Sequence, residues 1–126
     1  MEKIKCICVM RELYKALSLL ENELQTTHGV SLNEAMVMCA IGTDSITAST
    51  VTGQTGLSAS NASKVIRALE RRKLLLRKFG KDDKRLVFLS LTASGKDKLD
   101  KLKCHQFDIP PTLLRFFDTG DSAIYQ

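Results

Sequence analysis

Residues 57–92 change from a helical to an extended hydrophobic pattern within one continuous stretch, and this change constrains the fold more than any other feature of the chain. Between Ala62 and Leu69 the apolar residues recur three and four positions apart, which predicts a helix with one buried stripe. Two segments rich in Leu, Val and Phe follow at residues 74–79 and 85–91 with turn-prone residues between them, which predicts a β-hairpin. Both faces of the second segment carry apolar side chains, so the hairpin must pack against helices.

The start and the outward face of this helix can also be read from the sequence. Ser58 is placed to accept a hydrogen bond from the first turn, and Gly56 suits a turn conformation that costs other residues energy. We therefore expect the helix over residues 59–72. Opposite its apolar stripe lie hydroxyl, ammonium and guanidinium groups that suit phosphates and base edges, namely Ser60, Lys64, Arg67 and Arg71. In isolation this pattern is more typical of an ordinary amphipathic surface helix.

The tip of the predicted hairpin is strongly charged, with three basic residues beside Asp82 and Asp83. Residues two positions apart point the same way along an extended strand, so Asp83 is expected to hold the Arg85 side chain in place. An arginine oriented in this way suits the DNA minor groove, because the negative potential of the groove attracts guanidinium groups and less rotamer entropy is lost on binding. The alternative interpretation is a surface ion pair that contributes about 0–1 kcal/mol.

Basic residues are concentrated in one part of the chain. Residues 60–104 contain 14 Lys and Arg against 5 Asp and Glu, whereas residues 1–59 contain 4 against 6 and residues 105–126 contain 1 against 3. A segment of net charge +9 therefore lies between two segments of −2. Such a concentration predicts a nucleic-acid partner and a salt-dependent affinity. Single-strand binding is disfavoured, because only Phe79 and Phe88 offer aromatic rings for stacking in this segment.

Several motifs in this region resemble those of the MarR (multiple antibiotic resistance) family of winged helix-turn-helix regulators. The most specific is an Asp-x-Arg wing with a closing Leu-Thr-x-x-Gly, and a helix opening near residue 32 is more loosely similar to the family's Leu-Thr-x-x-Gln. The residues that carry the resemblance are Gly56-Leu57-Ser58, the helix through Leu69-Glu70, Asp83-Lys84-Arg85, Val87-x-Leu89-x-Leu91-Thr92-x-x-Gly95 and Ser31-Leu32-Asn33-Glu34. Together they span about half of the chain.

The resemblance implies a mostly α fold with a small β-hairpin (α+β), that is, a winged helix-turn-helix with flanking N- and C-terminal helices. The size of the chain favours a single domain over residues 1–126. Within it we expect a DNA-binding core at residues 31–92, flanked by dimerisation helices in residues 1–30 and 93–126. The resemblance further implies a transcriptional regulator, in particular a repressor, that binds a pseudo-palindromic operator in double-stranded DNA as a homodimer.

By the same resemblance, the helix at residues 59–72 is the recognition helix in the major groove, and the hairpin at residues 75–91 is the wing at the minor groove. A rival interpretation is a winged-helix module that binds protein, which would favour a hydrophobic exposed face over a basic one. The residues expected to contact DNA, with Asp83 orienting the wing, are Ser58, Ser60, Asn61, Ser63, Lys64, Arg67, Arg71, Lys81, Lys84 and Arg85.

Four further helices are expected outside this region. A stripe over about residues 3–27 predicts an N-terminal helix whose apolar side is ordinary core, and residues 35–41 are apolar around nearly the whole turn, which predicts a fully buried helix. Residues 47–55 should form the first helix of the helix-turn-helix, although Gly and β-branched residues each lower its helix propensity by up to about 1 kcal/mol. Thr92 is expected to cap a last helix that ends near residue 104. The N-terminal stripe consists of Met10, Leu13, Leu17, Leu20 and Leu24.

The C-terminal segment is short for a dimerisation region. Pro110 and Pro111 interrupt it, because proline breaks a helix interior. The apolar group that follows is small and consists of Leu113, Leu114, Phe116 and Phe117. We therefore expect a weaker dimer than is usual for the family, or one that depends on the N-terminal helix.

The cysteines and histidines admit several interpretations. Cys39 is expected to be buried as a small hydrophobe. Cys6 or Cys8 is a candidate redox-sensing thiol, because some MarR-like regulators sense peroxide through a cysteine in the first helix, with inert packing as the alternative. His28 and His105 are expected to be isolated polar residues, so we predict no metal site. No catalytic cluster or phosphate loop is recognisable, so we predict neither a cofactor nor an enzyme.

Two expectations concern small molecules and location. Tyr14, Met36 and Met38 are candidates for lining an effector pocket, with core packing as the alternative. The apolar run at residues 6–10 is too short for a signal sequence or a membrane span, which favours a cytoplasmic protein without membrane contact.

Overall fold

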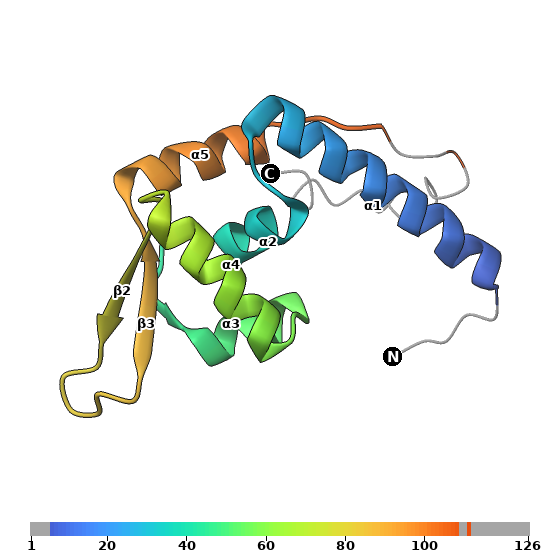
Figure 1. Cartoon of the computed structure of the whole chain (residues 1–126). Helices are drawn as coiled ribbons and strands as arrows, with labels where there is room; N and C mark the ends of the chain where they lie inside the picture. Colours follow the sequence, from blue (N-terminus) through green and yellow to red (C-terminus); the bar gives the residue numbers. More distant parts are fainter. Residues whose placement is uncertain (1–5, 109–110, 112–126) are drawn as a thin grey trace.

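The structure, a computed structural model, describes residues 6–108 and residue 111. The apolar group expected at residues 113–117 lies outside the described residues. Within the described part the chain forms five helices and a three-stranded sheet (Figure 1), which confirms the predicted α+β fold. In chain order the elements are α1 (Ile7–His28), α2 (Leu32–Ile41), β1 (Ile46–Thr47), α3 (Ala48–Thr55), α4 (Ala59–Arg71), β2 (Leu75–Phe79), β3 (Val87–Leu91) and α5 (Ala93–Lys103).

Helix α2 lies at the centre of the protein. It contacts α3, α4, α5 and β3, and its Val37, Met38 and Ile41 side chains are no more than 1% exposed. A capping box defines its start: Ser31 Oγ accepts a hydrogen bond from the Glu34 N–H at 3.0 Å, and the Glu34 carboxylate accepts one from the Ser31 N–H at 2.9 Å. The capping box fixes the first residue of α2. The apolar side chains of α2 then pack against the other elements in one core.

The sheet is antiparallel, with the strand order β1-β3-β2. Leu75 of β2 pairs with Leu91 of β3, and these two residues and Leu89 are buried in the core. The short strand β1 is a third strand that the sequence pattern does not predict. It has only two residues, of which Ile46 pairs with Leu89, and two residues are too few to show an alternating pattern.

Helix α3 forms despite its low helix propensity, and its hydroxyl groups explain how. Thr47 caps its N-terminus by accepting a hydrogen bond from the Thr50 N–H at 3.2 Å. Thr55 donates its hydroxyl to the Val51 carbonyl at 2.7 Å, and the helix ends on Gly56, whose φ is 76°. Val51 is fully buried and attaches the helix to the core. Caps and packing thus compensate for poor propensity.

The connection between β3 and α5 explains the Leu-Thr-x-x-Gly motif. Thr92 Oγ1 accepts a hydrogen bond from the Gly95 N–H at 3.0 Å, which confirms the predicted cap. The same hydroxyl donates to the Lys73 carbonyl at 2.7 Å, in the turn that precedes β2. A Cβ atom at Gly95 would overlap the backbone carbonyl of Leu74, so only glycine lets α5 approach this turn. The motif therefore fixes the hairpin against the helices.

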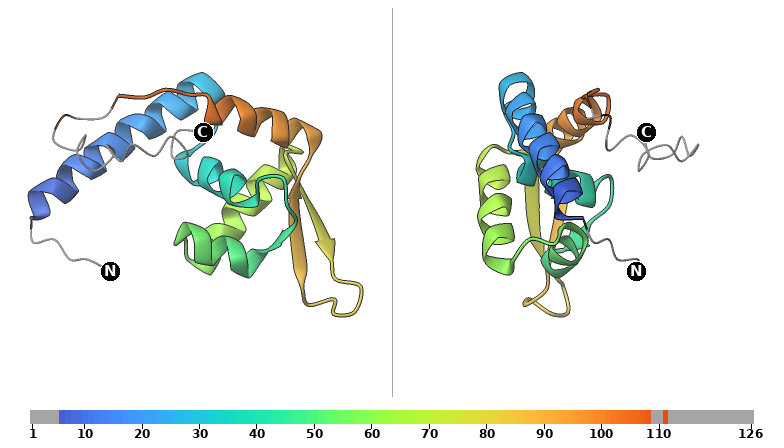
Figure 2. Two further views of the ribbon diagram at one scale, coloured as in Figure 1. Left: turned by 180° about the vertical axis from the view of Figure 1, so that it is seen from behind. Right: turned by 90° about the vertical axis from the view of Figure 1, so that its right-hand side faces the viewer.

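Helix α1 differs from the predicted N-terminal core helix. It extends away from the rest of the protein, as Figure 1 and the left view of Figure 2 show. Leu24 is its only buried residue among those described, whereas Met10 and Leu17 of the expected stripe are 46% and 41% exposed. The prediction of ordinary core packing is therefore wrong for the N-terminal part of the stripe, because this part of α1 projects beyond the core.

Candidate nucleic-acid interface

Helix α4 presents the outward face that the sequence predicts. Ser58 caps the helix, with its Oγ accepting a hydrogen bond from the Asn61 N–H at 3.1 Å. Ala62, Ile66 and Leu69 are no more than 4% exposed and face the core. The predicted DNA-contacting residues of this helix and its cap are all exposed, namely Ser58, Ser60, Asn61, Ser63, Lys64, Arg67 and Arg71. Packing on one side thus holds the helix while its polar side stays in solvent.

The other three predicted residues, Lys81, Lys84 and Arg85, are exposed at the tip of the hairpin. Asp83 Oδ1 accepts hydrogen bonds from the Arg85 backbone N–H at 2.9 Å and from the Arg85 Nε at 3.2 Å, so the expected contact is present. The Arg85 side chain is nevertheless 92% exposed. The pair therefore orients the guanidinium group without burying it and contributes little to folding.

The backbone at this tip forms a turn, in contrast to the extended strand that the two-residue spacing suggests. The Leu86 N–H donates to the Asp83 carbonyl at 3.1 Å, and β3 begins only at Val87. Asp side chains commonly accept hydrogen bonds from the backbone two residues further on in such turns. A Cβ atom at Gly80 would come within 2.7 Å of the Asp83 carbonyl oxygen, so this position also favours glycine. The contact between Asp83 and Arg85 arises from turn geometry.

Arg77 is a basic residue of the wing that the charge pattern did not distinguish. Its guanidinium lies 3.4 Å from the Glu70 carboxylate of α4, so an ion pair links the wing to this helix. Arg77 also lines an open hollow of about 330 Å³ between α3, α4 and the wing. Strand alternation is the signal that could have found it, because Arg77 shares one face of β2 with the buried Leu75.

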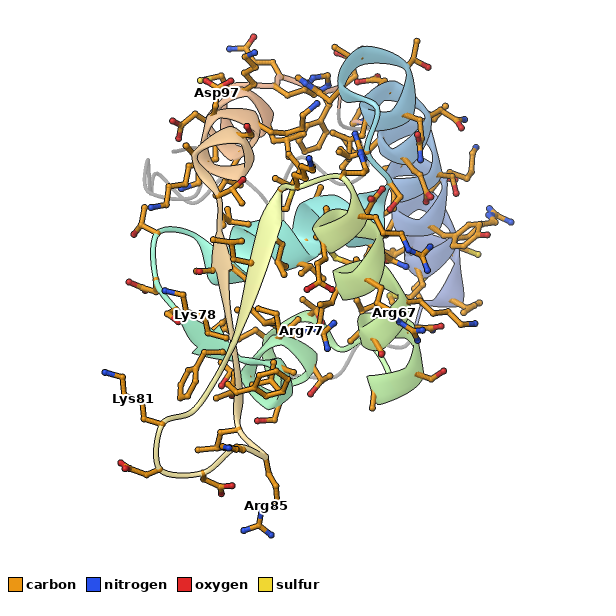
Figure 3. The ribbon with its side chains drawn as sticks, turned by 60° about the vertical axis from the view of Figure 1, so that its left-hand side comes forward. Arg67, Arg77, Lys78, Lys81, Arg85 and Asp97 are labelled. Atoms are coloured by element: carbon orange, nitrogen blue, oxygen red, sulfur yellow. The ribbon has the colours of Figure 1, made fainter. Side chains whose placement is uncertain are left out.

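Basic side chains extend along the wing from α4 to its tip. Figure 3 shows Arg67 on α4 and Arg77 on one side of the hairpin, Lys78 and Lys81 on the other side, and Arg85 at the far end. Hydroxyl groups from α3 add to this surface, since Ser49 and Thr52 line the same hollow as Arg77. Ammonium, guanidinium and hydroxyl groups of this kind bind phosphate oxygens.

A second hollow, of about 220 Å³, lies between α1, α2 and α5. Its walls are largely apolar and include Met36, one of the three residues expected to line an effector pocket. Met38 is instead buried in the core, which confirms the alternative of core packing for this residue. Tyr14 is 72% exposed on α1, so it neither lines the hollow nor packs in the core. Lys103 and His105 are the polar residues in its lining.

All four cysteines are exposed and form no disulfide. This corrects the expectation that Cys39 is buried, because α2 turns Met38 toward the core and Cys39 toward the apolar hollow. Cys6 is the N-cap residue of α1, where the backbone N–H groups of Val9 and Cys8 lower the pKa of its thiol, although the thiol forms no capping hydrogen bond. A lower pKa increases the thiolate fraction at neutral pH.

The two histidines are not isolated, which corrects a further expectation. His28 Nε2 lies 3.1 Å from His105 Nδ1, in a contact between α1 and the segment that follows α5. Among the described residues, no group of three or more His, Cys, Asp or Glu side chains is arranged to hold a metal ion. In residues 6–108, no helix combines the length and apolar character needed to cross a membrane.

Comparison with known proteins gives a family and a fold. Residues 31–95 match the family model of the winged helix DNA-binding domain. None of the curated proteins compared with the chain matches it. Among solved structures, the chain is similar to BpsR of Bordetella bronchiseptica, whose DNA binding is regulated by 6-hydroxynicotinic acid. The TM-score is 0.68 with 20% identity, covering 75% of this chain and 72% of BpsR.

Two more solved structures share this fold. A mutant of MarR from E. coli, complexed with operator DNA, gives a TM-score of 0.66 with 18% identity, covering 75% of this chain and 67% of MarR. The transcriptional regulator BldR from Sulfolobus solfataricus gives 0.71 with 15% identity, covering 93% of this chain and 79% of BldR. The predicted resemblance is thereby confirmed: the chain belongs to the family of winged helix DNA-binding domains and has the fold of the MarR regulators.

Proposed function

We propose that the protein is a cytoplasmic, sequence-specific DNA-binding transcriptional regulator, and in particular a repressor. One observation carries the proposal: α4 and the hairpin both expose basic residues, and the start of α4 and the tip of the hairpin both lie at the end of the protein away from α5 (Figure 3). In this proposal residues 31–92 bind DNA, and the flanking residues 1–30 and 93–126 serve dimerisation. Helix α4 enters the major groove and the wing reaches the adjacent minor groove.

The two elements have different tasks in this proposal. The major groove admits an α-helix, and the guanidinium of Arg67 and the amide of Asn61 are groups that recognise guanine and adenine edges. These side chains of α4 set the sequence preference. The wing residues Lys81, Lys84 and Arg85 contact backbone phosphates and the minor groove, which adds affinity with little dependence on sequence.

A protein-binding function is the second candidate, because the wing also exposes apolar side chains. Leu76, Phe79 and Leu86 are 50%, 64% and 45% exposed. Exposed apolar residues on a projecting hairpin suit a protein partner. The exposed side of α4 is polar and basic instead, which favours DNA.

We further propose that the regulator is a homodimer. Helix α1 exposes part of its apolar stripe, in which Met10 and Leu17 are 46% and 41% exposed. A stripe of this kind suits a second copy of the chain, since symmetric dimers pair identical surfaces. Two copies would present their α4 helices to half-sites about 34 Å apart, which matches a pseudo-palindromic operator.

Selection of bound duplexes from a random DNA pool, combined with the mass of the protein in solution, tests this function. We expect a palindromic enriched motif and the mass of a dimer. Enrichment of one half-site by a monomer would keep DNA recognition and exclude the dimer. Binding without any enrichment, lost as salt rises, would reflect charge alone and would exclude sequence-specific regulation.

A small-molecule effector is a further part of the proposal. BpsR is regulated by 6-hydroxynicotinic acid, and the similar protein NadR has been solved in complex with 4-hydroxyphenylacetate. We propose that the apolar hollow between α1, α2 and α5 takes an aromatic acid, with Lys103 placed to attract its carboxylate. Either acid should raise Tm in wild type and not in Met36→Trp, which fills the hollow. An equal rise in both proteins would exclude this site.

Thiol-based regulation is the alternative that the position of Cys6 favours, since this thiol is exposed and has a lowered pKa. Peroxide treatment should then weaken DNA binding by wild type but not by Cys6→Ser. Cys104→Ser is the matched control, because Cys104 is also exposed and lies on another element. Equal loss of binding in wild type and Cys6→Ser would exclude Cys6 as the sensor.

A further inference from the structure

The only two histidines of the chain meet where α1 joins the rest of the protein. His28 is the last residue of α1, and His105 directly follows the C-cap residue of α5. Their facing nitrogen atoms, His28 Nε2 and His105 Nδ1, are 3.1 Å apart. The rings pack edge to face with their centroids 5.1 Å apart. The contact joins positions 77 residues apart in the sequence, so it is part of the tertiary structure.

Two more polar contacts extend this junction. His105 Nε2 lies 2.9 Å from Glu23 Oε2 of α1, and the His105 side chain is only 14% exposed. Lys98 of α5 donates from Nζ to the backbone carbonyl of His28 at 2.9 Å. The last carbonyl groups of a helix lack partners within the helix, and a lysine is a favourable partner for them. Three contacts therefore connect the end of α1 with α5 and with His105, which follows the C-cap residue of α5.

The number of protons on the pair decides whether the ring contact can exist. When both rings are neutral, His105 Nε2–H donates to Glu23, and His105 Nδ1 accepts from His28 Nε2–H. One extra proton is tolerated, because His105 then donates from both nitrogen atoms and His28 accepts at Nε2. A second proton is not tolerated, since both facing nitrogen atoms would carry hydrogen and two positive charges would meet.

We propose that the His28–His105 pair is a proton-operated latch, which holds α1 against the end of α5 while at least one ring is neutral and releases it when both rings are charged. Leu24 is the only buried residue of α1 among those described, so the contacts at this end largely determine where α1 points. Release would therefore reorient the helix that carries the exposed apolar stripe. The latch concerns the protein alone and does not depend on DNA binding.

The surroundings of the pair set the direction of its pH dependence. Burial, followed by the charges of His105, Lys98 and Lys101, lowers the pKa of His28 below its ordinary value of 6.5. As the pH falls, the unfolded chain therefore binds this proton before the folded protein does. The contribution of the latch to folding stability is accordingly present above pH 6.5 and is lost as the pH falls below 6.5. The other charged or titratable groups near the pair are Glu23 of α1, Asp97, Asp100 and Lys103 of α5, and the C-cap residues of α4 and α5, Arg72 and Cys104.

Nuclear magnetic resonance of the full-length protein tests the latch, because two histidines give only two sets of ring signals. We expect ring-to-ring proton contacts at neutral pH that are lost as the pH falls below 6.5. Over the same range, exchange of the amides in the last turn of α1 should rise about tenfold beyond its intrinsic pH dependence. Rings that titrate independently, without any response of these amides, would overturn the proposal.

Substitutions distinguish the effect of the histidine pair on amide exchange from the effect of other titrating groups. His28→Gln should abolish the pH-dependent rise in amide exchange, because the glutamine cannot take up a proton. Glu21→Gln is the matched control: this exposed carboxylate also lies on α1, and the rise should be retained. Persistence of the full rise in His28→Gln would overturn the latch. If His28→Gln fails to fold, the titration of wild type still decides the question.

Discussion

Helices α4 and α1 both have an apolar stripe at helical spacing, yet only α4 buries it. Ala62, Ile66 and Leu69 of α4 are no more than 4% exposed, whereas α1 buries Leu24 alone among its described residues. The partners of α4, which include α2, α3 and β2, belong to the same core. The N-terminal part of α1 projects beyond that core (Figure 2). Periodicity thus identifies the apolar face of a helix, and the tertiary structure decides what covers it.

The largest expected effect contrasts buried and exposed leucines. Leu69→Ala should lower the free energy of unfolding by about 2–5 kcal/mol, because it leaves a cavity in the core. Leu19→Ala is the matched substitution on α1, where the side chain is 63% exposed, and should change the value by less than about 0.5 kcal/mol. Both are measured by denaturant unfolding at low concentration, where any dimer has dissociated. Equal losses would show that α1 is part of the folding core.

Local rules predicted most of the core correctly. The caps at Ser58 and Thr92, the helix over most of residues 47–55 and the hairpin all follow from short sequence signals, and the structure confirms them. These features depend on residues a few positions apart, so the sequence shows both partners together. The exposure of α4's polar side likewise follows from periodicity within a single helix.

Local rules of this kind do not predict contacts between segments that are far apart in the sequence. The pairing of Ile46 with Leu89, the ion pair of Glu70 with Arg77 and the meeting of the two histidines all require the tertiary structure. The exposure of Cys39 has a similar cause, because residues 35–41 of α2 are apolar around nearly the whole turn and only the neighbouring elements decide which side is covered. The sequence therefore predicted which residues form the candidate interface better than it predicted the contacts that these residues make with other segments.

The second prediction tests whether the apolar stripe of α1 forms the dimer interface. Leu17→Glu places a charge in the apolar stripe and should weaken a dimer by at least about 2 kcal/mol, since the carboxylate would be buried without a partner. This corresponds to roughly a thirtyfold increase in the dimer dissociation constant. Analytical ultracentrifugation measures it, and Ser18→Glu, at the adjacent exposed position, is the control. An unchanged constant in Leu17→Glu would move the dimer interface away from this stripe.

The third prediction concerns the part of the core that we propose reads DNA. Arg67→Ala should cost about 1–3 kcal/mol of binding at one base position of the operator and relax the preference there, because a base contact is lost. Binding to a panel of single-base operator variants measures this loss. Lys96→Ala removes a positive charge from the exposed side of α5 and should leave the preference unchanged. A uniform loss across the panel would assign Arg67 to phosphate binding instead.

The smallest expected effect lies at the tip of the wing, where folding and binding separate most clearly. Arg85→Ala should reduce the salt dependence of binding by about one phosphate contact, and its stability should hardly change because the side chain is 92% exposed. Asp83→Ala keeps the arginine but removes the acceptor oxygen that orients it, so affinity should fall although a negative charge near the DNA is lost as well. If Asp83→Ala binds at least as tightly as wild type, orientation by Asp83 has no role, and Arg85 acts by charge alone.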